Sequence, residues 1–261
     1  MQNSAPTITV RNANLAFQSI TLFNQLNLNL EGGKTTCLLG PSGVGKSSLL
    51  RLIAGLHLDK FNPKDDNQLN NIIEASDHQS LSNRIAYMAQ SDLLMPWLTI
   101  LDNVLIGAKL RGDFTKKKSY FKNLAMDLLE KVGLIKVAHQ HPMSLSGGMR
   151  QRAALVRTLI EDHPIVLMDE PFSALDVITR LNLQDLAANL LKNRTVLLVT
   201  HDPLEALRIA HRIHVMSGSP VKLDQALIPP GDPPRDLSDH SLLELQGQLL
   251  QRLRSAYEDK I

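Results

Sequence analysis

The sequence predicts an α/β protein built on a parallel β-sheet, and three features of the chain indicate it. Residues 165–168 and 195–200 are short, continuous apolar runs, which are typical of strands buried on both faces of a parallel sheet. The segment 178–191 between them has the length of a crossover helix. Residues 91–162 have a helical pattern throughout, so we expect a helical subdomain inserted into the α/β lobe.

The N-terminal part of the chain is predicted to form strands and a helix on either side of a phosphate-binding turn. Residues 22–30 alternate apolar and polar side chains with a period of two, which predicts a half-buried strand. A second strand is expected over 34–39, and a helix begins at Lys46 and ends near Gly55. Strand, glycine-rich loop and helix is the context that a phosphate loop requires.

The C-terminal part continues this pattern more briefly. The segment 60–83 is polar, and we expect a surface excursion there. One more strand is expected after 217–220, and the prolines of 229–234 should break regular structure. Leucines at helical spacing between 242 and 253 predict an amphipathic terminal helix.

Composition excludes several classes of protein. Lys and Arg number 28 against 26 Asp and Glu, and the net charge of +2 is too small for nucleic-acid binding driven by bulk charge. The N-terminus does not resemble a secretory signal, and no run reaches the roughly 18 apolar residues of a membrane helix. We therefore expect any membrane association to occur through a partner. The single cysteine, Cys37, is interpreted as a small core residue and fits a reducing compartment.

The segment Gly40–Ser47 has the pattern of a phosphate loop. Its glycines let backbone N–H groups at a helix N-terminus surround anionic oxygens. Lys46 would supply a point charge at the β- and γ-phosphates, and the Ser47 hydroxyl is placed for Mg²⁺. The alternative, a glycine-rich turn without a ligand, explains less of the pattern.

Acidic and imidazole side chains follow the two apolar runs. Asp169 emerges at the carboxyl end of a buried strand, where open α/β sheets bind ligands. Glu170 is a candidate base for an attacking water, and His201 could hydrogen-bond a γ-phosphate. On these residues alone, an Asp-Glu pair that caps the next helix is an equal alternative. A lone histidine at a strand end is more often structural.

A third segment, Leu145–Arg152, opens a helix with a serine cap and two glycines, which leaves backbone amides free for an anion. In order and spacing, residues 40–47, 145–152 and 165–170 together resemble the ATP-binding subunit of an ABC transporter. The likeness spans residues 8–215 and includes 171–176, which look like the family's D-loop.

The resemblance implies a P-loop NTPase (ABC ATPase) fold: a parallel-sheet core, an N-terminal antiparallel β portion and the inserted helical subdomain. We expect one ATPase domain over 1–220, with its α/β lobe at 1–90 and 163–220 and the helical subdomain at 91–162. A tail with the amphipathic helix would occupy 221–261.

The resemblance also assigns roles to individual residues. It implies a head-to-tail dimer with a second copy of the chain, in which each signature segment completes the other subunit's ATP site. Met149 stands where the family often has glutamine, which leaves the backbone amides available. For Phe17 a core position is the alternative to stacking on adenine, and for Gln90 the support is mainly its neighbourhood. The residues implied for ATP are Phe17, Gly40, Pro41, Ser42, Gly43, Val44, Gly45, Lys46, Ser47, Ser48, Ser146, Gly147 and Gly148; those for Mg²⁺ are Ser47, Gln90 and Asp169; those for catalysis are Glu170, His201 and Gln90.

The segment 93–104 looks like the nitrate, sulfonate, taurine and thiamine-pyrimidine importers, with the thiamine-pyrimidine branch slightly favoured. That likeness implies integral-membrane permease subunits, an indirectly acting periplasmic solute-binding protein, and a peripheral location on the cytoplasmic face of a bacterial inner membrane. Trp97 is expected to face the permease, with a core position as the alternative.

Two other classes share part of the pattern. A soluble ABC ATPase of DNA repair or translation has the same motifs, but usually with tandem cassettes or a long coiled-coil insertion, which this chain lacks. A P-loop kinase would explain 40–47 and leave 145–148 and His201 without a purpose.

Overall fold

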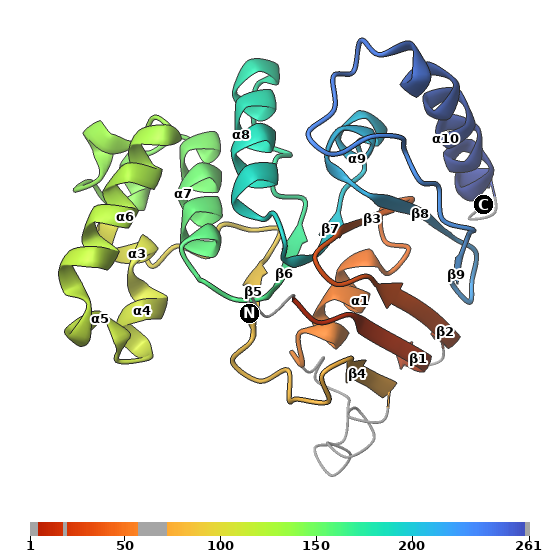
Figure 1. Ribbon diagram of the computed structural model, residues 1–261, viewed down its shortest axis with the longest axis horizontal. Coiled ribbons are helices and arrows are strands. Elements are labelled where there is room, and N and C mark those ends of the chain that lie inside the picture. The colour runs from red at the N-terminus through yellow and green to blue at the C-terminus, as the bar shows by residue number, and fades with distance from the viewer. Residues whose placement is uncertain (1–4, 18–19, 57–71, 259–261) are drawn as a thin grey trace. The chain divides into compact units, whose positions relative to one another are not determined.

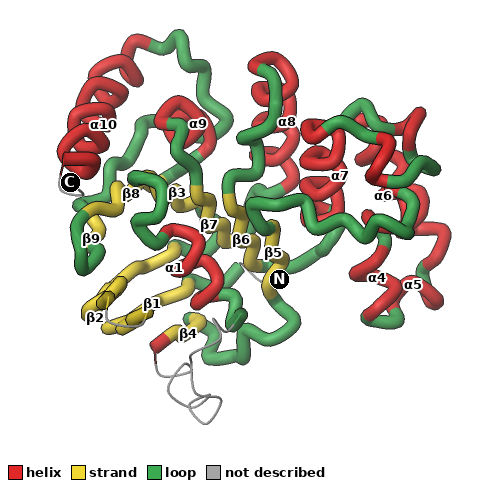
Figure 2. The backbone as a smooth tube through the Cα atoms, turned by 180° about the vertical axis from the view of Figure 1, so that it is seen from behind, coloured by secondary structure: helices red, strands yellow, loops and turns green. Residues whose placement is uncertain are grey.

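A computed structural model describes residues 5–17, 20–56 and 72–258 of the chain, which forms two compact units. The chain leaves the first unit and returns to it twice. The first unit is drawn from Met1–Ile85, Pro164–Glu170 and Leu191–Ile261, and the second from Ala86–His163 and Pro171–Leu190. Figures 1 and 2 show their helices and strands.

The first unit contains the parallel sheet that the sequence predicts, with strands in the order β6-β7-β3-β8-β9. β3 pairs in parallel with β7 and β8, β6 pairs in parallel with β7, and β9 runs antiparallel to β8. Every residue of β6 and β7 is buried, because helices cover both faces of a parallel sheet. The strands are β3 (Thr35–Leu39), β6 (Ile165–Asp169), β7 (Thr195–Val199), β8 (Arg212–Ser217) and β9 (Lys222–Leu223).

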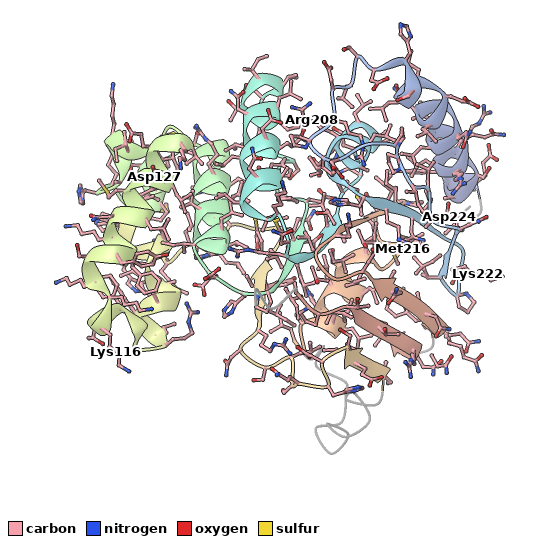
Figure 3. The ribbon with its side chains drawn as sticks, in the orientation of Figure 1. Lys116, Asp127, Arg208, Met216, Lys222 and Asp224 are labelled. Carbon is pink, nitrogen blue, oxygen red and sulfur yellow. The ribbon has the colours of Figure 1, made fainter. Side chains whose placement is uncertain are left out.

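Three helices of the first unit pack on this sheet. α1 (Lys46–Ile53) contacts β6 and β7, and α9 (Pro203–Ile209) contacts β3. α10 (His240–Glu258) packs against α9 and β8 and is the predicted terminal helix. Figure 3 shows Asp224 beside this helix, where its carboxylate accepts a hydrogen bond from Arg252 at 2.8 Å. This bond ties α10 to the chain that leaves β9.

A small antiparallel sheet, in the order β2-β1-β4, completes the first unit. Its strands are β1 (Ile8–Phe17), β2 (Ile20–Leu30) and β4 (Ile73–Ala75). In β2 the alternate residues Leu26, Leu28 and Leu30 are buried, which confirms the period of two. The surface excursion predicted for 60–83 is wrong at β4, which pairs with β1; residues 60–71 lie outside the described part of the chain.

The second unit is helical apart from β5 (Ile85–Met88), most of which belongs to it. α3 packs against α6 and α7, and α6 packs against α7, so the helical segment predicted from the sequence is confirmed. Across the described ranges, no helix is long and apolar enough to cross a membrane. The helices are α3 (Ile100–Val104), α4 (Ile106–Leu110), α5 (Asp113–Lys116), α6 (Lys118–Lys131), α7 (Gly147–Leu159) and α8 (Val177–Leu190), with short 3₁₀ turns at Ile135–Val137 and Pro142–Ser144.

Candidate nucleotide site

The glycine-rich loop joins β3 to α1 in the first unit. Gly40, Gly43 and Gly45 have φ values of 148°, 76° and 112°, a region that side-chain-bearing residues rarely adopt. A Cβ on Gly40 would lie 2.6 Å from the Met216 carbonyl oxygen, so this position also lacks room for a side chain. The loop therefore delivers bare backbone to the N-terminus of α1, whose first N–H groups have no partner within the helix.

Lys46 is folded back over this loop. The side chain is buried, and its Nζ donates to the Gly40 oxygen at 2.7 Å and to the Pro41 oxygen at 3.0 Å. Ser48 follows in the first turn of α1. The loop therefore holds a cation in its interior, next to the amides that can receive an anion.

Asp169 ends β6 and lies against the beginning of α1. Its carboxylate is buried and accepts a hydrogen bond from the Ser47 hydroxyl. Burial raises the pKa of Asp169, the Ser47 hydrogen bond opposes that shift, and the charge of Glu170 adds to it. Hydroxyl and carboxylate oxygens are ligands that Mg²⁺ prefers, so this pair fits a metal site.

Glu170 follows directly and has a left-handed backbone conformation, with φ of 48°. Its N–H donates to the Val199 oxygen at 2.8 Å, which holds the residue at the end of β7. Its carboxylate Oε1 lies 3.2 Å from Nδ1 of His201, whose side chain is exposed. Asp202 then caps α9 by accepting from two backbone N–H groups. A base and an imidazole therefore lie together at the carboxyl ends of β6 and β7.

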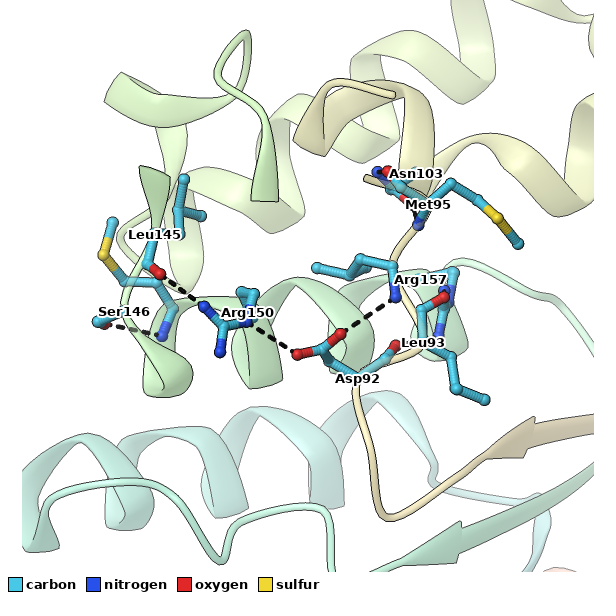
Figure 4. A network of polar contacts seen from close by, with 10 residues as sticks. Asp92, Leu93, Met95, Asn103, Leu145, Ser146, Arg150 and Arg157 are labelled. Atoms are coloured by element: carbon cyan, nitrogen blue, oxygen red, sulfur yellow. Dashed lines mark hydrogen bonds and ion pairs between the residues drawn. The ribbon is translucent and has the colours of Figure 1, made fainter. Parts of the chain in front are cut away.

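The second unit carries the other candidate anion site. Ser146 caps α7, and its Oγ accepts a hydrogen bond from the Met149 N–H at 3.3 Å. Arg150 donates to the Leu145 oxygen at 2.8 Å and to the Asp92 carboxylate at 3.0 Å, as Figure 4 shows. The Ser146 cap is the one the sequence predicts, and the amides of the following glycines point along the helix axis at its N-terminus.

Two contacts around α7 were not predicted from the sequence. The buried Gln151 side chain donates to the Ser173 hydroxyl at 3.1 Å and accepts from the Ala174 N–H at 2.7 Å. A Cβ on Gly148 would lie 3.0 Å from the Ala174 oxygen. The helix after the signature is therefore packed directly onto residues 173–174. The only sequence signal was a glutamine on the apolar side of a helix.

The structure also locates the other residues named in the sequence analysis. Gln90 is exposed just after β5 and belongs to the second unit. Phe17 is the last residue of β1, and its side chain lies outside the described part of the chain. Trp97 is 70% exposed and Leu93 is 59% exposed, so the core alternative for Trp97 is wrong. Cys37 is buried in β3, as its interpretation as a core residue requires.

The chain is similar along most of its length to proteins of a known family. The family model described as "ABC transporter" matches residues 23–173. The chain is 43% identical to an uncharacterized ABC transporter ATP-binding protein of Haemophilus influenzae, over 94% of this chain and 98% of that protein. It is 38% identical to an aliphatic sulfonates import ATP-binding protein of Pseudomonas savastanoi, over 93% and 94%.

Solved structures give the same result. An ATP-binding cassette solved as a dimer in a post-hydrolysis state, bound to ADP and Pi, has a TM-score of 0.68 and is 27% identical. The match covers 86% of this chain and 99% of that one. A metal-chelate type ABC transporter in an inward-facing conformation has a TM-score of 0.64 and is 29% identical, with 84% and 83% coverage.

Proposed function

The chain belongs to the ABC transporter family of ATP-hydrolysing subunits, and we propose that it powers a bacterial importer for a small solute. The observation that carries this proposal is one cluster in the first unit. Ser47 bonds Asp169 beside the buried Lys46, and Glu170 lies 3.2 Å from His201. These are the groups that phosphoryl transfer to water needs: phosphate binding, metal ligation, a base and a hydrogen-bond donor.

In this proposal, different residues of the chain have separate roles in ATP binding and hydrolysis. The amides of the glycine-rich loop and the Lys46 ammonium bind the phosphates of ATP, and Phe17 stacks on adenine. Ser47, Asp169 and Gln90 would hold Mg²⁺, which neutralises phosphate charge when bound. Glu170 accepts the proton of the attacking water, and His201 donates a hydrogen bond to the γ-phosphate. The raised pKa of Asp169 marks a buried charge that a cation would stabilise.

The second anion site requires a second chain. One copy already has a phosphate loop, so the free amides after Ser146 are proposed to face the γ-phosphate held by another copy in a head-to-tail dimer. The dimeric structures of related cassettes support a dimer of this chain. We retain the division predicted above, with an ATPase domain over 1–220, a helical subdomain over 91–162 and a tail over 221–261.

The partners follow from the relatives. Sulfonate import proteins similar along more than nine tenths of the chain support integral-membrane permease subunits as partners. The exposed Trp97 is proposed as a permease contact, because exposed tryptophans are typical interface anchors. A periplasmic solute-binding protein and a peripheral position on the cytoplasmic face of the inner membrane complete the proposal. Among solutes, the named relatives favour aliphatic sulfonates over a thiamine pyrimidine.

The test uses two substitutions, one in each proposed half of the site. Glu170→Gln removes the base but keeps the size of the side chain, so it should bind ATP without hydrolysing it. The variant should be a dimer with MgATP and a monomer without nucleotide, measured by size exclusion with light scattering. Adding Ser146→Arg should abolish the dimer, whereas adding Ser241→Arg, at an exposed position in α10, should leave it intact.

The outcomes separate the alternatives. A Ser146→Arg double variant that still dimerises on MgATP would contradict the role of the signature in the second half of the site. A soluble, non-transport ABC ATPase is the other candidate, and it would dimerise in the same way. Co-purification of membrane subunits with the tagged chain from its own cells distinguishes the importer from that ATPase.

A further inference from the structure

The positive charge of the chain is concentrated in one short stretch, residues 109–122, which we call the basic segment. It contains six Lys or Arg residues and one acidic residue, whereas the whole chain has 28 and 26. The rest of the chain is therefore net negative. The basic segment runs from the end of α4 through α5 into the first turn of α6, within the second unit.

The basic segment is almost entirely on the surface. Residues 109–112 and 115–120 are all exposed, and Figure 3 shows Lys116 pointing away from the helices. Two apolar side chains are exposed among these cations: Leu110 is 81% exposed and Tyr120 is 60% exposed. Exposed cations and exposed apolar groups therefore occur together in this segment.

Most of these cations are not used within the unit. Lys109 pairs with Asp102, and Arg111 pairs with Glu161. The remaining four, Lys116, Lys117, Lys118 and Lys122, have no acidic partner among the side chains that the structure describes. Their charge is directed to solvent, where it can attract an anionic surface.

We propose that the basic segment binds the anionic phospholipid headgroups of the membrane beside the permease. Clusters of four or more lysines are attracted to anionic lipid, and each cation contributes independently of sequence. Leu110 favours a lipid surface over nucleic acid, because an aliphatic side chain gains from burial at the acyl boundary but not from a phosphate backbone. This contact goes beyond the proposed function, in which attachment occurs through the permease alone.

The fold fixes the basic segment close to the proposed permease contact. The Lys109 ammonium bonds Asp102 on α3 at 2.6 Å and lies 5.6 Å from the centre of the Phe114 ring. These contacts hold α4 and α5 onto α3, which begins three residues after Trp97. The position of the lipid contact beside the permease therefore rests on the proposed role of Trp97. The affinity of the basic segment for anionic lipid does not depend on that role.

The experiment measures binding of the purified chain to vesicles that contain no permease. One set is pure phosphatidylcholine, and the other has three phosphatidylglycerols in every ten lipids. The wild type should co-sediment with the anionic set at low salt and be released at high salt, because screening shortens the electrostatic range. It should not co-sediment with the neutral set.

Two triple variants with equal net charge identify the surface. Lys116→Gln/Lys117→Gln/Lys118→Gln should lower partitioning onto anionic vesicles about a hundredfold, at about fivefold for each lysine. A matched control replaces exposed lysines elsewhere with glutamine, at Lys136, Lys192 and Lys222, and should bind like the wild type. Glutamine has nearly the helix propensity of lysine, and equal melting temperatures verify that both variants fold.

Three outcomes would overturn the inference. They are equal binding to the two vesicle sets, equal losses in the two triple variants, or binding of the basic segment to single-stranded RNA but not to vesicles. These outcomes would leave the proposed ATPase function unaffected, because both triple variants keep the residues of the ATP site. The MgATP-dependent dimer of Glu170→Gln tests that chemistry separately.

Discussion

Replacing Lys46 with alanine removes the one cation that the glycine-rich loop encloses. Lys46 is 6% exposed, and its ammonium donates to the Gly40 and Pro41 oxygens at 2.7 and 3.0 Å. In the proposed complex with ATP it exchanges these carbonyls for phosphate oxygens. Alanine leaves the phosphate charge uncompensated in a site that is largely shielded from water.

The size of the effect follows from Coulomb's law. Two unit charges about 4 Å apart interact by about 4 kcal/mol at an effective dielectric constant of about 20. About 1.4 kcal/mol corresponds to a tenfold change in rate, so kcat should fall roughly a thousandfold if this interaction is complete only in the transition state. The fold should persist, because the Lys46 ammonium donates to carbonyls of the loop and the substitution removes a charge from the site.

The assay is phosphate release at saturating MgATP, with melting temperature as the measure of folding. Lys192→Ala, at an exposed position in the same unit, serves as the matched control and should keep wild-type activity. Lys46→Arg should recover little, because a guanidinium is too large for a position shared with two carbonyls. Activity of Lys46→Ala above a tenth of wild type, with an unchanged melting temperature, would refute the assignment of the phosphate loop.

Three further substitutions test other parts of the molecule. Trp97→Ala should weaken co-purification with the permease by about 2 kcal/mol or more while ATP affinity and melting temperature stay unchanged; a collapse of the melting temperature would contradict its exposed position. Asp169→Asn should abolish hydrolysis yet raise stability at neutral pH. Because burial raises the pKa of Asp169, the wild type is destabilised above the unfolded value of 3.8, and the advantage of the variant should vanish below that pH in melts over a pH series. Arg235→Ala should cost about 3 kcal/mol of unfolding free energy in urea melts, because this buried guanidinium donates to five backbone carbonyls, and Arg235→Lys should not restore it.

The parallel core could be predicted because its strands carry a strong local signal. Residues 165–168 and 195–200 are continuously apolar, since both faces of β6 and β7 are covered. β4 escaped prediction because it has three residues, and only Ile73 and Ala75 are buried against β1. Three residues are too few to establish a period of two, so pairing with a distant strand determines this element.

The candidate site was predictable where topology brings distant residues together. Ser47 and Asp169 are far apart in the sequence, but Ser47 begins the helix that follows the carboxyl end of β3 through the glycine-rich loop, and Asp169 ends β6. The carboxyl ends of parallel strands meet at one edge of the sheet, which brings the two residues together. Two features depend on tertiary contacts that no local sequence pattern indicates. One is the positive φ of Glu170, and the other is the set of hydrogen bonds that Arg235 donates to surrounding backbone carbonyls. A single arginine in a proline-rich segment would ordinarily be expected at the surface.

The contacts of α7 link two functions that the sequence suggested separately. Arg157 donates to the Asp92 and Leu93 oxygens at 2.6 and 2.8 Å, and Arg150 of the same helix bonds the Asp92 carboxylate. The chain that leads to Trp97 is therefore fixed to the helix that Ser146 caps. Because both lie within the second unit, a permease that displaces Trp97 must either move the signature with it or break these charge-assisted bonds. Charge-assisted hydrogen bonds are stronger than neutral ones, so we expect the contact proposed for the permease and the contact proposed for the second copy's nucleotide to move together.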